Sequence, residues 1–284
     1  MTANIVALVD GSIYSASVCE HAAWVATKTG ASLELVHVLG PREAPETQDL
    51  SGSIKLGARS ALLEELAELD AQRARLIGHR GRAILEDASE IVKRAGVSDV
   101  STRMRHGDVV DTLAELERNA AMIVVGKRGE AADFARGHLG SNLERIVRAA
   151  HKPVLVAARA FRPVSKVLVA YDGGVSAMKA VDHIARNPLF MGLPVTIVTA
   201  GAQSPAAHKS LADAAALITA AGLPVETRLL AGQPEAVLAK LVEDEGFGLL
   251  VMGAYGHSRI RTLIIGSTTT ELLRSCKVPV LLLR

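Results

Sequence analysis

Short apolar runs alternate with amphipathic stretches along the whole chain. The runs that predict buried strands lie at 5–9, 33–38, 122–125 and 154–156, and again at 167–171, 195–199, 249–252 and 280–283. Weaker strand signals fall at 100–105 and 225–230, and helical periodicity is clear at 109–119 and 234–243. Apolar strands without polar alternation, separated by helices, are typical of a parallel sheet covered on both faces. The pattern predicts an α/β fold with five strands in each half of the chain, each half a doubly wound domain.

The two halves repeat one another. NIVALVD at 4–10 matches KVLVAYD at 166–172, AMIVVGKRG at 121–129 matches GLLVMGAYG at 248–256, and the segment 139–156 matches 265–282. Because three blocks recur in one order, the sequence predicts a tandem duplication. We expect a first domain at 1–158, a linker near Pro163 and a second domain at 165–284.

Most of the extra length of the first half is a helical insertion at about 40–80. Leu62, Leu66, Leu69 and Leu76 form a narrow apolar seam there, interrupted by Glu and Gln residues. The seam predicts a helix that either packs on its own domain or contacts a partner or a second copy.

Composition narrows the class of protein. The chain is 49% hydrophobic and 22% charged, has a formal net charge of +2, and contains only 3% aromatic residues. Balanced charge and few aromatics disfavour a nucleic-acid partner. Cys19 and Cys276 form no CxxC pair, and no apolar run is long enough for a membrane span. We expect a cytoplasmic protein without a signal peptide or membrane partner.

Candidate chemistry follows the second-half strands. Asp172 ends the first strand, Gly253 and Gly256 follow the fourth, and Gly266, Ser267 and Thr268 open the next helix. The glycines would allow positive φ and close backbone approach, and a helix N-terminus favours an anion. Ordinary turns and helix caps are the alternative interpretation of each glycine pair. There is no P-loop, no GxGxxG after a first strand, and no motif for catalysis or for a metal site.

The spacing G-2x-G-9x-G-[ST], with an aspartate ending the first strand, resembles the ATP-binding signature of the universal stress protein family. The resemblance covers both halves and implies two five-stranded domains that meet through their last strands. It implies that Asp172 contacts a ribose and that the segment at Val198 and Thr199 lines an adenine pocket. By the same resemblance, Gly253, Gly256, Gly266, Ser267 and Thr268 hold ribose and phosphates. Because a bare triphosphate is highly charged, a divalent cation, Mg²⁺ or Mn²⁺, is expected with the phosphates.

The first half departs from this pattern. Asp10, Gly126, Gly129, Gly140 and Ser141 match by type, but the loop between the glycines is one residue longer. Nucleotide binding is therefore expected in the second half and left open in the first. Lys127 is a candidate phosphate contact or a solvated loop residue.

The expected function is a stress-response sensor or signalling module that binds ATP or a related adenine nucleotide. Two alternatives remain from the sequence: a slow ATPase or self-phosphorylating enzyme, and a nucleotide-free interaction scaffold. The two domains are expected to pair within the chain, and a homodimer is possible.

Overall fold

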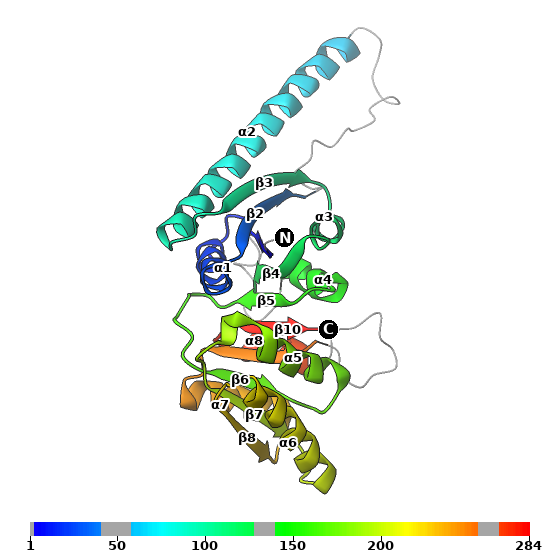
Figure 1. The fold of residues 1–284 in the computed structure, drawn as a ribbon. Coiled ribbons are helices and arrows are strands. Elements are labelled where there is room, and N and C mark those ends of the chain that lie inside the picture. Colours follow the sequence, from blue (N-terminus) through cyan, green and yellow to red (C-terminus); the bar gives the residue numbers. More distant parts are fainter. Residues whose placement is uncertain (1–2, 41–57, 128–139, 255–266) are drawn as a thin grey trace.

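The structure, a computed structural model, describes residues 3–40, 58–127, 140–254 and 267–284. The first half contains the strands β1 (Asn4–Leu8), β2 (Ser32–Leu39), β3 (Val100–His106), β4 (Ala120–Gly126) and β5 (Val154–Ala157). The second half contains β6 (Val167–Ala170), β7 (Val195–Ala200), β8 (Val225–Leu230), β9 (Leu249–Gly253) and β10 (Val280–Leu283). Within the described residues they form one sheet in the order β3-β2-β1-β4-β5-β10-β9-β6-β7-β8 (Figure 1).

Helices cover both faces of this sheet. They are α1 (Ser15–Thr29), α2 (Ala58–Arg94), α3 (Val109–Leu116), α4 (Ser141–Ala149), α5 (Val175–Arg186), α6 (Pro205–Ala220), α7 (Pro234–Glu245), α8 (Ser267–Ser275) and the short 3₁₀ helix η2 (Pro188–Phe190). One core cluster joins the sheet to α1, α2, α5 and α6, and another joins it to α3, α4, α7 and α8. Because both faces are buried, the strands read as continuous apolar runs.

The two halves have equivalent topologies and meet at their last strands. Each half is parallel throughout, whereas β5 and β10 pair antiparallel, with Leu155 opposite Leu281. This confirms the doubly wound fold in tandem and is consistent with the implied pairing of the two domains. Since the central pair is antiparallel, the carboxyl ends of the strands in the two halves point in opposite directions at the junction.

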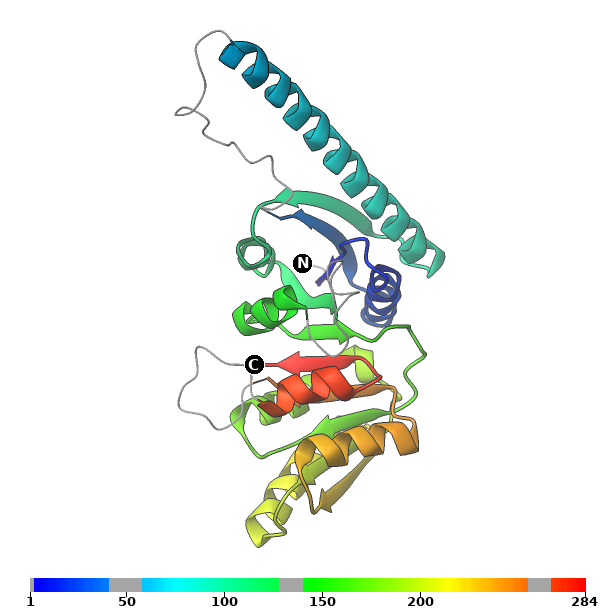
Figure 2. The same ribbon diagram turned by 180° about the vertical axis from the view of Figure 1, so that it is seen from behind.

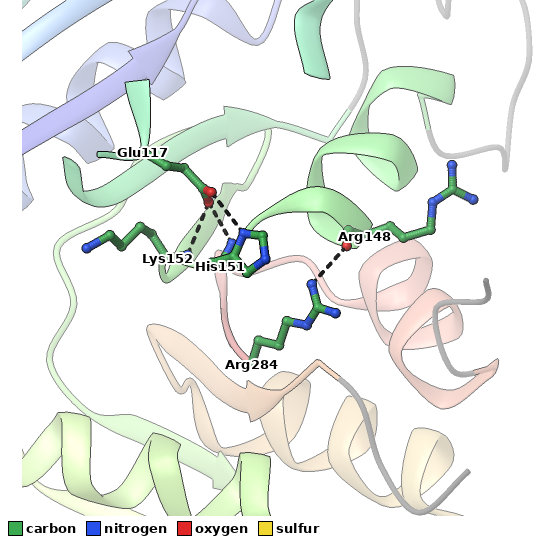
Figure 3. Close-up of polar contacts among 5 residues, drawn as sticks. All are labelled: Glu117, Arg148, His151, Lys152 and Arg284. Atoms are coloured by element: carbon green, nitrogen blue, oxygen red, sulfur yellow. Dashed lines mark hydrogen bonds and ion pairs between the residues drawn. The ribbon is translucent and has the colours of Figure 1, made fainter. Parts of the chain in front are cut away.

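Polar contacts tie the loop before β5 to its neighbours, and one of them reaches from the second half to the first (Figure 3). The buried carboxylate of Glu117 accepts hydrogen bonds from the backbone N–H groups of His151, at 2.6 Å, and Lys152, at 3.1 Å. The guanidinium of Arg284, directly after β10, donates to the carbonyl of Arg148 on α4 at 3.3 Å.

The linker between the halves packs on α1. The ring of Phe161 meets His21 edge-on, with 5.0 Å between ring centroids, and lies 6.5 Å from Trp24. His21 is fully buried, and its Nδ1 lies 2.7 Å from the carbonyl oxygen of Ser17. The linker thus closes one side of the junction with an aromatic side chain.

The helix α2 is 37 residues long, and only its C-terminal part packs on the sheet. Leu85, Ala88 and Val92 are buried, whereas the N-terminal end of α2 extends away from the sheet in both views (Figures 1 and 2). Leu69 is 55% exposed and Leu76 is 70% exposed. The prediction that the leucine seam packs on its own domain is therefore wrong, because the N-terminal part of α2 extends beyond the sheet.

Two further points concern the predicted absence of a membrane span and the predicted insertion. None of the described helices is both long enough and apolar enough to cross a membrane. The first residues of the predicted insertion, 41–57, lie outside the described part of the chain.

Candidate functional site at the carboxyl edge of the second half

The register of the second-half strands gathers the predicted residues at one edge of the sheet. Ala170 of β6 pairs with Val198 of β7 on one side and with Met252 of β9 on the other. Asp172, Thr199 and Gly253 each follow these positions by one or two residues. They therefore meet where the chain order reverses between β6 and β9, which is the usual ligand position in open α/β sheets.

Asp172 forms a tight turn between β6 and α5. Its Oδ1 accepts a hydrogen bond from the N–H of Gly174 at 2.8 Å, and Gly173 has φ +76°, a conformation that favours glycine. The side chain is exposed, and among the described residues its carboxylate accepts no other hydrogen bond. One carboxylate oxygen thus faces solvent at the switch in strand order.

Val198 and Thr199 are held more tightly than the sequence suggests. Val198 is 1% exposed and belongs to the core cluster under α7 and α8. The hydroxyl of Thr199 donates to the carbonyl of Tyr171 at 2.8 Å, which ties the end of β7 to the turn at Asp172. Only the half-buried Thr199 presents part of its surface at the edge.

Gly253 serves the fold directly. It is absent from the glycines with positive φ, so the expected left-handed backbone is wrong at this position. A Cβ here would lie 2.8 Å from the Cβ of Ser176 and 2.9 Å from the backbone nitrogen of Ala177. The glycine lets the end of β9 touch the first turn of α5, so a side chain at 253 would disturb the fold as well as a ligand.

The remaining second-half positions are only partly described. Gly256 and Gly266 lie outside the described residues. The helix α8 begins at Ser267, as the motif predicts, and Thr268 in its first turn is half-buried. The first turn of α8 has backbone N–H groups without helical partners, which is the feature that suits an anion.

The corresponding turn of the first half is closed by its own side chains. Oδ1 of Asp10 accepts hydrogen bonds from the N–H of Ser12 at 3.0 Å and from the hydroxyl of Ser15 at 3.1 Å. The second half has Gly174 and Ala177 at the positions equivalent to these serines, so Asp172 has no such hydroxyl beside it. This serine-to-alanine difference was readable in the aligned repeats.

The other first-half positions lie at the ends of β4 and α4, and their neighbour Lys127 contacts the second half. Gly126 ends β4 as predicted, Gly140 precedes α4, and Ser141 begins that helix, while Gly129 lies outside the described residues. Lys127 is 8% exposed and donates to the carbonyl of Cys276 at the end of α8. Lys127 is therefore not a solvated loop residue, and its ammonium contacts the second half.

Sequence reasoning missed an apolar side chain next to each aspartate turn. Val175 is 73% exposed and Ile13 is 53% exposed, although both are aliphatic. They occupy equivalent positions in the two halves, three residues after Asp172 and Asp10. The repeats show that both positions are aliphatic, but their exposure appears only in the structure.

Several ionisable groups in the described part of the chain have shifted pKa values. Burial raises the pKa of the Cys19 thiol to about 12 and also raises the pKa of Cys276, so both stay protonated. The Arg145 guanidinium, 2.7 Å from Asp108, lowers the pKa of that carboxyl at the start of α3. In the part of the chain that the structure describes, no group of three His, Cys, Asp or Glu side chains could hold a metal ion.

The protein is a tandem α/β protein. It contains two copies of a five-stranded, doubly wound parallel sheet, joined through their antiparallel last strands. In each copy the carboxyl ends of the strands form the edge at which open α/β sheets usually bind ligands. The chain belongs to the universal stress protein family, whose sequence model matches residues 1–158 and 163–284.

Individual relatives can be aligned with this chain over nearly its full length. The chain is 40% identical over 285 residues to the universal stress protein Slr1230 of Synechocystis sp. (strain ATCC 27184 / PCC 6803 / Kazusa), covering 99% of both chains. It is 27% identical over 311 residues to the universal stress protein Rv1996 of Mycobacterium tuberculosis, covering 99% of this chain and 95% of that one. A universal stress protein structure from Archaeoglobus fulgidus has the same fold, with a TM-score of 0.72, 21% identity and coverage of 99% and 98%.

Proposed function

We propose that the protein binds ATP or a related adenine nucleotide at the carboxyl edge of its second half. Asp172 carries the proposal, because its exposed carboxylate has one hydrogen bond, from Gly174, among the described residues. A ribose offers two adjacent hydroxyl donors, and a carboxylate is the acceptor that suits them.

An apolar surface for the nucleotide lies beside this carboxylate. Val175 is 73% exposed in the first turn of α5, directly after the Asp172 turn. Covering an aliphatic side chain of this kind with the flat face of a base or the carbon skeleton of a ribose removes apolar surface from water, which favours binding by about 25 cal/mol per Å². Thr199 at the end of β7 would form the neighbouring edge of the site, with its hydroxyl already engaged by the carbonyl of Tyr171.

The phosphates belong at the glycine motif. The resemblance assigns them to Gly253, Gly256, Gly266, Ser267 and Thr268, of which Thr268 lies in the first turn of α8. The positive end of the helix dipole and the free N–H groups of that turn would stabilise the phosphate charge. Mg²⁺ or Mn²⁺ would arrive with the phosphates and neutralise part of their charge.

The second half is the better site for a physical reason. The Asp10 carboxylate is engaged by Ser12 and Ser15, so binding a ribose there would break or share two existing hydrogen bonds. Asp172 has the equivalent bond from the N–H of Gly174 but no hydroxyl at the position of Ser15, where Ala177 stands. We therefore place one nucleotide on each chain, and we infer that the protein works in the cytoplasm as a stress-response sensor or signalling module.

Titration with a fluorescent adenine nucleotide in the presence of Mg²⁺ tests the assignment. Asp172→Ala should weaken binding about 10- to 100-fold, the loss expected when charge-assisted hydrogen bonds are removed. Asp213→Ala, an exposed aspartate on α6 of the same half, is the matched control and should leave the affinity unchanged. Equal affinities for wild type and Asp172→Ala, or a loss in Asp10→Ala instead, would contradict the assignment.

A further inference from the structure

The free part of α2 has an apolar seam with nothing of its own chain against it in the described structure. Leu62 is 39%, Leu69 55% and Leu76 70% exposed, and Leu66 is half-buried (Figures 1 and 2). Three of these leucines recur every seven residues, which is the repeat of helices that pack side by side in a coiled coil. Residues 62–80 alone extend about 28 Å at 1.5 Å per residue.

The charges on this part of the helix are separated by sign. Glu64, Glu65, Glu68 and Asp70 are acidic, with no basic residue among positions 62–70. The following stretch, 71–82, holds four arginines and no acidic residue. Apart from Arg59 in its first turn, the helix is therefore negative toward its outer end and positive toward the body of the protein.

This distribution gives the isolated helix little support. Glu64 and Glu68 are four residues apart, a spacing at which like charges destabilise a helix by about 0.2–0.5 kcal/mol. None of the four acidic residues, and neither Arg73 nor Arg75, forms an ion pair or hydrogen bond with another side chain in the described structure. A long helix without packing is only marginally stable in water, so a partner that covers the seam would stabilise it.

We propose that α2 pairs with α2 of a second copy of this chain, antiparallel, through the Leu62–Leu76 seam. Antiparallel pairing brings Glu64, Glu65 and Glu68 of each helix near the basic stretch of the other, while Asp70 lies close to the two-fold axis. Parallel pairing would align acid with acid and bring Arg73 of one copy beside Arg73 of the other in the middle of the seam. The charge pattern selects the antiparallel orientation by opposing the parallel one.

The seven-residue repeat fixes a specific register for the pair. The two-fold axis passes near Gln72, so that Gln72 faces Gln72 of the second copy. Leu66 then packs against Leu76 of the second copy, and Glu65 faces His79. The same register lays the aliphatic stems of Arg73 and Arg80 over Leu69 and Leu62 of the second copy, with their charged ends in water. Each helix contributes the same surface, as an isologous contact requires, and the two tandem bodies lie at opposite ends of the helical pair.

The mass of the full chain in solution tests the pairing. Size-exclusion chromatography with light scattering at tens of micromolar should give about twice the chain mass of 29.8 kDa. Leu69→Lys combined with Leu76→Lys should give a single chain with unchanged fluorescence of its one tryptophan, Trp24 on α1, which shows that the body remains folded. Leu217→Lys, at a 44% exposed leucine on α6, is the matched control and should stay dimeric. A wild-type monomer, or a dimer that survives the double substitution, would overturn the proposal.

Cysteine cross-linking tests the orientation, since both native cysteines are buried. Gln72→Cys should give a covalent dimer with a short bis-maleimide reagent. Glu65→Cys alone should not, because antiparallel pairing separates the two copies of that position by about 21 Å along the axis. A mixture of Glu65→Cys and His79→Cys chains should cross-link. Efficient self-cross-linking of Glu65→Cys would show a parallel pair and overturn the proposal.

Discussion

A single methyl group at Gly253 should destabilise the second half. The Cβ of Gly253→Ala would stand 2.8 Å from the Cβ of Ser176 and 2.9 Å from the backbone nitrogen of Ala177. Carbon atoms in contact normally lie about 3.5–4.0 Å apart, so the first turn of α5 must retreat from β9 by about 0.7 Å or more. No side-chain rotation relieves the contact, because one partner is backbone and the other is a Cβ.

The loss of stability depends on the gaps that this shift of α5 opens in the core. Ala177 is 3% exposed and Ala180 is fully buried, so a shift of α5 opens gaps in a closely packed core. Overpacked core positions typically lose about 1–3 kcal/mol. We expect Gly253→Ala to lower the free energy of unfolding by that amount.

Urea unfolding followed by circular dichroism measures this change. Gly40→Ala is the control, because a Cβ at Gly40 would meet nothing within 4 Å and its φ is ordinary. The difference between the two variants isolates the contact with α5. If Gly253→Ala unfolds at the same urea concentration as Gly40→Ala, the close approach of β9 to α5 is refuted as the reason for glycine at 253.

Three other outcomes follow from described contacts. Burial lowers the pKa of His21 below its ordinary 6.5, so the unfolded chain takes the proton first and the free energy of unfolding falls as pH drops below that value. In His21→Leu, the free energy of unfolding measured with urea should fall less steeply across that range, by up to about 1.4 kcal/mol per pH unit. Phe161→Ala should cost about 1–3 kcal/mol in the same unfolding assay, since its ring packs on His21 and Trp24, and an unchanged midpoint would show that the linker is not docked. Gly78→Ala should slow amide exchange in the free part of α2, because alanine stabilises a helix by about 1 kcal/mol over glycine, and its nearest contact is Arg82 at 3.7 Å; faster exchange would contradict an ordinary helix there.

The sheet could be predicted from the sequence because buried parallel strands leave a simple trace. Each apolar run needs aliphatic residues on both faces, and the repeat of the runs identifies two copies of one fold. The predicted 280–283 and 225–230 strands coincide with β10 (Val280–Leu283) and β8 (Val225–Leu230). The apolar pattern did not predict the pairing of β5 with β10. That expectation came from the family resemblance alone.

Long-range contacts account for what the sequence did not show at the site. Gly253 reads as a loop glycine, and its role appears only when the first turn of α5 lies beside it. Lys127 reads as a surface cation, and its bond to the carbonyl of Cys276 joins residues 149 positions apart. Local propensity contains no information about such neighbours.

The insertion was predicted as a helix but not as a projecting one. Heptad-like leucines look the same whether they cover a domain or a partner, and only the length of the sheet decides between them. Here the buried residues of α2 begin near Gly81, and Leu62, Leu69 and Leu76 before it are exposed.

The number of nucleotides bound per chain tests the central claim most directly. Isothermal titration of the full chain with ATP and Mg²⁺ should give a stoichiometry near one, and Asp172→Ala should remove most of the binding heat. A stoichiometry near two would show that the Asp10 turn also accepts a nucleotide. No binding by the folded wild-type protein, or binding that Asp172→Ala leaves intact, would contradict the account.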